Sequence, residues 1–357
     1  MSLQSRAVTM TKQMIQIEST DPGTYENAMA DWITTQLAPY PNVRLSRQEV
    51  LPGRPNLIAE LTGDPSLPAL VMICHMDTVV VGDGWTLPPF DAIEKDGKIY
   101  GRGACDMKSG LACCLSAFQY AAETLQTSGK TPKQTLKLIC SMDEEDFMRG
   151  SEACIQAGWV TDHDWVIDAE PTNGQIQMAH KGRTWYEIDV QGHTAHASTP
   201  WKGADAIAAM AEIIREIRHA ILYAPVHPDM GSSTVTFGQI TGGYRPDHCK
   251  VWIDMRLVPP LNTEKTNAIV EAAIEHAEQS VSGISATYKI TGDRPPIEQN
   301  PTSPLLENLK LSCQEVTGEV PQVSCFTGYT DTAVIAGQLH NRNCMSYGPG
   351  CLEAAHQ

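Results

Sequence analysis

The stretch TLKLICSMDEED, residues 135–146, places an apolar run directly before a cluster of acidic residues. Its first eight residues predict a strand buried in a sheet. A helical pattern over 107–127 precedes this strand, and the short helical segment SEACIQAG follows it. Further buried strands are expected in NLIAEL and ALVMIC, at 56–61 and 69–74. Strands that alternate with helices predict an α/β fold with a doubly wound, mostly parallel sheet.

The pattern changes between about residues 178 and 291. Three stretches in this part alternate polar and apolar residues, as half-exposed strands do: GRTWYEIDVQG, STVTFGQI and KVWIDMRLV. Two amphipathic helices are expected at 203–222 and 262–280. This pattern is typical of a small α+β unit whose sheet is covered on one face. We therefore expect a larger domain over 1–177 and 292–357, with residues 178–291 inserted into it.

The charge, the apolar stretches and the cysteines of the chain exclude several classes of protein. The chain has 357 residues, a formal charge of −16 and a pI near 5.1, which argues against nucleic acid or an anionic membrane as a partner. There is no basic and apolar leader and no apolar stretch of membrane-spanning length. The eleven cysteines are odd in number and form no C-x-x-C pair. We expect a cytoplasmic protein with reduced thiols, buried in apolar segments at Cys74, Cys105, Cys113, Cys114 and Cys140.

Predicted strands of the larger domain run into potential metal ligands. ALVMIC is followed by His75, TLKLICSM by the run DEED at 143–146, and DWVIDA by Glu170. NCMSYG leads through a Gly-Pro-Gly turn to His356. Ligands of doubly wound sheets bind beyond the carboxyl ends of the strands. With Asp106, which lies ahead of the helix at 107–127, these side chains predict one metal site.

Each of these residues also has a simpler interpretation. His75 is compatible with an ordinary histidine at a strand end, and DEED with solvated charge at a helix N-terminus. Asp106 is equally compatible with the N-cap of the helix that follows, and Glu170 with the end of a strand before proline. Asp77 points to the same side as His75 in an extended chain and is placed to orient the imidazole. The recurrence of donors at successive strand ends favours the metal site.

Several motifs occur in an order and spacing that resemble one family: HMDTV, GWTLPPF with DGKIYGRGACDMKSG, DEED with GSEA, DAEPT, GHTAHAS, and GYTDTA with YGPG and AAH. This is the zinc-dependent family of acetylornithine deacetylase, succinyl-diaminopimelate desuccinylase and glutamate carboxypeptidase, which also contains aminoacylases. The similarity extends from about residue 55 to the end. It implies a catalytic domain with an inserted dimerisation domain, and two zinc ions per subunit.

The resemblance also implies a set of metal ligands. His75 and Glu170 are expected to bind one zinc ion, and Glu145 and His356 the other. Asp106 is expected to bridge them, since two neighbouring cations need a shared anion. Cobalt and manganese are alternatives to zinc.

Two more acidic residues have implied roles near these ligands. Asp77 is expected to orient the imidazole next to it. Glu144 is expected to be the general base, because zinc lowers the pKa of a bound water to roughly 7 and a carboxylate then completes its activation.

The inserted domain is expected to contribute to the reaction. The resemblance implies a homodimer in which a histidine of GHTAHAS reaches the partner's active site and stabilises the oxyanion. His196 matches that position, with His193 as the alternative; the simpler interpretation of both is a surface loop. Arg256 in DMRLVP resembles the arginine that binds the free carboxylate of the substrate. A salt bridge on the strand face is the alternative for Arg256.

Two departures from the family pattern affect the site. Gly328 and Thr330 are expected to line the substrate pocket, but Tyr329 stands between them where the family usually has glycine. We expect Tyr329 to reshape the pocket. The sequence also stops one residue after His356, where relatives continue through a terminal helix. Either a tail is missing or the second zinc site is exposed, and we expect a missing tail.

The motifs and the predicted site residues together indicate a function. Neither G-x-S-x-G nor H-E-x-x-H occurs, which argues against a serine hydrolase and against a metalloprotease with that helical zinc motif. We expect a metallohydrolase that cleaves the amide of an N-acyl amino acid or small peptide with a free carboxylate. We expect an activity like that of acetylornithine deacetylase or of the desuccinylase, and the alternative is a dipeptidase or glutamate carboxypeptidase. A non-catalytic metal or peptide binder is the alternative from another class.

Overall fold

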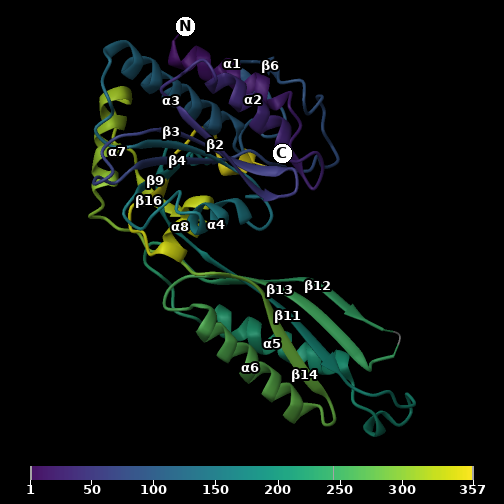
Figure 1. The fold of residues 1–357 in the computed structure, drawn as a ribbon. Helices are drawn as coiled ribbons and strands as arrows, with labels where there is room; N and C mark the ends of the chain where they lie inside the picture. The colour runs from purple at the N-terminus through teal and green to yellow at the C-terminus, as the bar shows by residue number, and fades with distance from the viewer. Residues whose placement is uncertain (1, 244, 356–357) are drawn as a thin grey trace. The chain divides into compact units, whose positions relative to one another are not determined.

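The computed structural model describes residues 2–243 and 245–355. The chain divides into two compact units. The first contains residues 1–178, 299–326 and 330–357, and the second contains residues 179–298 and 327–329. Figure 1 shows the elements of each unit. The predicted ligand His356 lies outside the described residues.

Within the described residues, the first unit is built on an eight-stranded sheet. Its central strands are parallel, while the strands paired at either side of them run antiparallel. The predicted α/β fold with a mostly parallel sheet is therefore confirmed. Across the sheet the order is β15 (Val323–Phe326), β10 (Ile176–His180), β16 (Cys344–Ser346), β9 (Trp165–Asp168), β4 (Leu70–His75), β8 (Leu136–Ser141), β3 (Arg54–Leu61) and β2 (Arg44–Leu51).

Helices cover both faces of this sheet (Figure 1). One face is covered by α1 (Leu3–Ile15), α2 (Asn27–Leu37) and α3 (Lys108–Ser128), and the other by α4 (Arg149–Gln156) and α8 (Asp331–Leu339). A further helix, α7 (Pro304–Thr317), packs through its first turn on β9, β10 and β16.

The spacing of apolar residues explains why α3 lies on the sheet. Leu111, Leu115, Phe118 and Ala122 recur at helical spacing and are completely buried. Burying each of the larger side chains stabilises the fold by roughly 1.5–3 kcal/mol. The helix is thereby fixed against β4 and β8, whose ends carry the site.

Two short strand pairs complete the first unit. β1 (Thr20–Asp21) pairs with β5 (Thr78–Val79), and β6 (Ile93–Lys95) pairs with β7 (Lys98–Tyr100). The first pair holds the segment before α2 against the segment after β4. A 3-10 turn, η2 (Leu352–Ala354), lies near the C-terminal end of the described chain.

The second unit contains an antiparallel sheet in the order β12 (Thr234–Gly242), β13 (His248–Leu257), β11 (Gly182–Gln191) and β14 (Ser285–Arg294). Two helices, α5 (Ala206–Leu222) and α6 (Thr263–Ser280), pack on one face. β11 alternates buried and half-exposed residues along its length, as a strand with one covered face does. A 3-10 turn, η1 (Pro200–Lys202), follows the GHTAHAS loop.

The cysteines differ in part from the prediction. Cys74 and Cys140 are buried, but Cys113 is exposed and Cys105 and Cys114 are only half-buried. Cys113 follows Leu111 by two residues and therefore falls off the apolar stripe of α3. Among the helices in the described part of the chain, none is both long and apolar enough to cross a membrane.

Candidate metal centre

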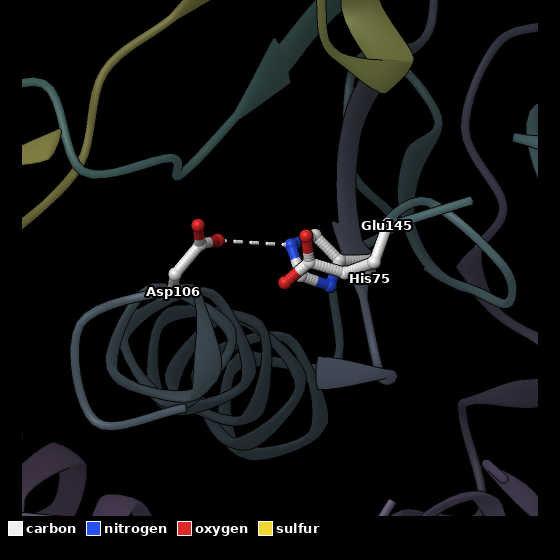
Figure 2. A group of neighbouring side chains, drawn as sticks. All are labelled: His75, Asp106 and Glu145. Carbon is white, nitrogen blue, oxygen red and sulfur yellow. Dashed lines mark hydrogen bonds and ion pairs between the residues drawn. The ribbon is translucent and has the colours of Figure 1, made fainter. Parts of the chain in front are cut away.

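His75, the last residue of β4, is only 1% exposed and has a defined orientation. Its Nδ1 lies 2.9 Å from the backbone carbonyl oxygen of Asp77. A carbonyl only accepts hydrogen bonds, so Nδ1 carries a proton, and in the neutral ring Nε2 is the nitrogen that offers its lone pair. Nε2 faces Asp106 Oδ1 at 3.2 Å, and Glu145 lies beside the pair (Figure 2). This is the tautomer that a metal ligand needs.

Two groups of donors share His75. His75, Asp106 and Glu145 form one group, and His75, Glu144 and Glu170 form the other. In each group the donor atoms lie within 4.8 Å of one another. Nε2 of His75 is 3.7 Å from Glu170 Oε1 and 4.0 Å from Glu144 Oε2. The structure thus brings together the predicted donors that it describes.

The acidic residues of these groups carry unfavourable charge in the absence of cations. Burial raises the pKa of Glu144 well above its ordinary value, and the carboxylates of Asp331 and Glu145 raise it further. Burial also raises the pKa of Glu170, and Asp106 adds to this effect. A divalent cation removes this repulsion and prefers this mixture of imidazole and carboxylate donors. The residues present therefore fit divalent metal ions.

Asp77 holds the acidic loop as well as the histidine. It is completely buried, and its carboxylate accepts hydrogen bonds from the backbone N–H groups of Glu144, at 3.2 Å, and Glu145, at 3.0 Å. His75 is oriented by the backbone carbonyl of Asp77, while its Nδ1 lies 3.6 Å from the Asp77 carboxylate. The sequence predicted that Asp77 orients the imidazole, but not that its carboxylate binds the backbone of the loop at Glu144 and Glu145.

Asp106 faces the donors and is not the N-cap residue of α3. That position belongs to Met107, whose own side chain forms no capping hydrogen bond. Gly110, in the first turn of α3, lies so close to the strand end before Glu170 that an added Cβ would come within 2.1 Å of the Ala169 carbonyl oxygen. A Cβ added at Gly348 would come within 2.2 Å of the same carbonyl oxygen. Two glycines thus bring α3, β9 and the segment after β16 into close contact.

A buried network supports the loop after β8. The Asp331 carboxylate accepts hydrogen bonds from the hydroxyls of Ser141, at 2.5 Å, and Ser151. Asn56 accepts a hydrogen bond from the backbone N–H of Met142 at 3.0 Å. Sequence reasoning assigned no role to these residues. The available signal was Asp331 inside the GYTDTA motif.

Residues predicted in the GHTAHAS loop are exposed in the second unit. His193 and His196 both lie on the surface. The backbone N–H of Ser198 donates to Nδ1 of His196 at 3.2 Å, so the neutral ring carries its proton on Nε2. In the neutral ring Nε2–H is therefore a hydrogen-bond donor. The His193 ring lies against Gly283.

Arg256 is engaged within its own strand. Its Nε and Nη2 donate to the two carboxylate oxygens of Asp254 at 2.9 and 3.0 Å. This fork is the salt bridge on the strand face that sequence reasoning gave as the alternative. A substrate carboxylate at Arg256 must share or displace Asp254.

The predicted pocket residues near Tyr329 differ in surroundings. Thr330 precedes α8, is 1% exposed and hydrogen-bonds through its hydroxyl to Thr332 at 2.8 Å. Gly328 is half-buried. Tyr329 is buried in the second unit, with its ring edge-on to His180 at a centroid distance of 6.3 Å.

The donor groups fit divalent metal ions, and the family to which the sequence belongs gives the class of protein, a metal-dependent hydrolase. The sequence profile of peptidase family M20/M25/M40 matches residues 71–357, and the chain belongs to this family. The expected family is thereby confirmed.

Curated relatives and a solved structure agree with this membership. A probable succinyl-diaminopimelate desuccinylase of Staphylococcus aureus (strain Mu50) is 28% identical over 337 residues, which cover 85% of this chain and 82% of the relative. An acetylornithine deacetylase of Buchnera aphidicola is 26% identical over 294 residues, which cover 79% and 72%. The aminopeptidase PepT of Bacillus cereus has the same fold, with a TM-score of 0.77 at 22% identity over 97% of this chain and 90% of that one.

Proposed function

We propose that this hydrolase cleaves the amide bond of N-acyl amino acids or small peptides that carry a free carboxylate, with two zinc ions per subunit. The observation that carries the proposal is the pair of donor groups that share His75, with Glu144 4.0 Å from its Nε2. The desuccinylase and deacetylase names of the relatives favour deacylation. A dipeptidase or carboxypeptidase activity is the second candidate, favoured by the peptidase family profile.

The proposed ligands divide between two metal positions. His75 and Glu170 would hold one ion, Glu145 and His356 the other, and Asp106 would be shared. When bound, such ions lower the pKa of a coordinated water to roughly 7 and polarise the substrate carbonyl. The hydrogen bond from His75 Nδ1–H to the Asp77 carbonyl keeps the donor nitrogen in place.

Glu144 moves the proton in the proposed reaction. Its carboxylate accepts a proton from the attacking water as the water oxygen bonds to the carbonyl carbon. It then delivers this proton to the amide nitrogen as the C–N bond breaks, which releases a carboxylic acid and an amine; the acid passes its remaining proton to the amine, so that the final products are a carboxylate and an ammonium ion. The hydrogen bond of its backbone N–H to Asp77 fixes the start of this side chain.

The second unit supplies two proposed contacts. His196 donates from Nε2 to the oxygen that gains negative charge, acting across a homodimer on the partner's active site. Arg256 binds the substrate carboxylate, and the other proposed substrate contacts are His193 and Gly328 of the same unit and Thr330 of the first unit. The guanidinium of Arg256 already binds both carboxylate oxygens of Asp254, so a substrate carboxylate has to compete with Asp254.

A substrate panel tests the proposal. N-acetyl amino acids, N-succinyl amino acids and dipeptides are each assayed with the protein after chelator treatment and after reloading with zinc, cobalt or manganese. We expect turnover of an acylated amino acid that vanishes with the chelator and returns with metal. Faster turnover of dipeptides would favour the second candidate. No turnover of any member by metal-loaded protein would contradict the proposal.

A further inference from the structure

The loop that carries Glu144 begins with an unusual backbone conformation. Asp143 has φ of +66°, in the left-handed region that few residues other than glycine adopt. Glu144 follows directly, so the torsion angles of Asp143 set the direction in which Glu144 leaves the sheet. Such a conformation persists only where its surroundings hold it.

Asp143 is held by both its backbone and its side chain. Its backbone N–H donates to Glu26 Oε1 at 3.2 Å, and Glu26 is completely buried. Its carboxylate, also completely buried, binds the guanidinium of Arg149 through two side-chain hydrogen bonds. These contacts fix Asp143 from the α2 side and from the α4 side of the loop.

Arg54 joins these contacts into one cluster. It is 6% exposed at the start of β3, and its Nη2 lies 2.5 Å from both Asp21 Oδ2 and Glu26 Oε1 and 3.3 Å from Asp143 Oδ1. Its Nε donates to Glu26 Oε2 at 2.9 Å, and its guanidinium lies over the Tyr25 ring. One guanidinium therefore compensates three neighbouring carboxylates, a role that suits the planar fork of arginine and not the point charge of lysine.

We propose that Arg54 is a positioning residue for Glu144. Its contact with Glu26 orients the carboxylate that binds the Asp143 backbone, and its contact with Asp143 balances that buried charge. Without Arg54, Asp21, Glu26 and Asp143 repel one another, Asp143 leaves its left-handed conformation, and Glu144 loses its alignment. The proposal rests on the proposed function, which makes Glu144 the general base.

The primary test compares metal-loaded full-length variants on a substrate that the wild-type protein turns over. Arg54→Met removes the charge at similar volume, and we expect kcat to fall about 10–100-fold, since a misplacement near 1 Å costs about that much. KM should stay within about threefold and the metal content should be unchanged. Arg54→Lys should lose less activity than Arg54→Met and provides a second variant if Arg54→Met does not fold.

A matched control and a rescue separate positioning from general destabilisation. Arg44→Met removes an arginine of the adjacent strand β2 that pairs with Glu60 at 3.1 Å, and should leave kcat unchanged. Millimolar guanidinium ion should restore part of the kcat of Arg54→Ala and none of that of Arg44→Met or Glu144→Gln. An effect on stability alone would not produce this selective rescue.

A double variant distinguishes failure of this proposal from failure of the proposed function. If Arg54 acts through Glu144, Arg54→Met should lower the residual rate of Glu144→Gln by much less than it lowers the wild-type rate. An equal factor in both backgrounds, an unchanged kcat of Arg54→Met, or a loss confined to KM or to metal content would overturn the positioning role. Full activity of Glu144→Gln would instead overturn the proposed function.

Discussion

His75 in the first unit is 1% exposed, whereas His193 and His196 in the second unit lie on the surface. The acidic residues differ in the same way. Glu144 and Glu170 are buried against other carboxylates, while Glu187 on the open face of the second sheet pairs with Lys250 and Lys289 at 2.8 and 2.6 Å.

This difference shows where structure alone can identify chemistry. Buried carboxylates that face one another are unfavourable without cations, so their arrangement itself points to a metal site. Charges on an open sheet face are satisfied by neighbours and water. For His196 and Arg256 the proposed roles therefore rest on the resemblance to the family.

The largest expected effect is that of Glu144→Gln. This change keeps the shape of the side chain but removes its basicity, and turnover should fall by about 10²–10⁴-fold. Bound metal, measured by elemental analysis, should stay at the wild-type level. Glu187→Gln is the matched control from the second unit and should change turnover by no more than about twofold.

Loss of metal from Glu144→Gln would contradict its role as base and make it a ligand of the second donor group. Equal losses in Glu144→Gln and Glu187→Gln would remove the distinction between buried and exposed glutamates.

His196→Ala should have the next largest effect. Removal of a hydrogen-bond donor to a developing oxyanion costs about 10²–10³-fold in kcat. His193→Ala should reduce kcat less. If His196 acts across a homodimer, mixed dimers of His196→Ala and Glu144→Gln should regain activity, because one of their two sites has both groups intact.

Subunit exchange between differently tagged variants measures this recovery. Isolated mixed dimers that remain as inactive as the parents would exclude action of His196 on the partner's site. A monomeric protein with full activity would exclude it as well.

The smallest expected effect is that of His180, a buried histidine at the end of β10, where the second unit begins. Burial lowers the pKa of His180 to about 3, against about 6.5 in an unfolded chain. The folded state thus binds fewer protons, and its stability falls as the pH drops from 6.5 towards 3. This contribution is at most about 1.4 kcal/mol per pH unit.

Thermal unfolding between pH 6.5 and 4.5 measures the effect as a difference between variants. The midpoint of His180→Leu should fall less steeply with decreasing pH than that of the wild-type protein. The control variant His163→Leu changes an exposed histidine, and its midpoint should depend on pH as that of the wild-type protein does. Parallel curves for all three proteins would show that His180 does not titrate differently on folding.

The sequence predicted the parts of the site that follow buried strands. His75, Glu144, Glu145 and Glu170 stand at such positions, and the parallel arrangement of β4, β8 and β9 brings them to one edge. The short β10 and the polar β2 were missed, because neither has an apolar run of its own. β14 was also missed, since its alternation is weak and it is largely exposed.

The cluster around Arg54 could not be predicted from the sequence. Arg54 follows a turn and is surrounded by unremarkable residues, while its partners Asp21, Glu26 and Asp143 come from three other places in the chain. No local pattern distinguishes this arginine from exposed Arg44 ten residues earlier. Only the folded chain shows which of them is buried with three carboxylates.

Gly110 and Gly348 have a consequence for engineering this enzyme. Both meet the carbonyl oxygen of Ala169. Gly110 therefore sets how closely the segment carrying Asp106 approaches the segment carrying Glu170, and Gly348 sets how closely the segment after β16 approaches it. A methyl group at either position would clash with this carbonyl oxygen and push the segments apart. Libraries that seek new substrates can therefore vary the surrounding loops, but they should leave positions 110 and 348 without a side chain.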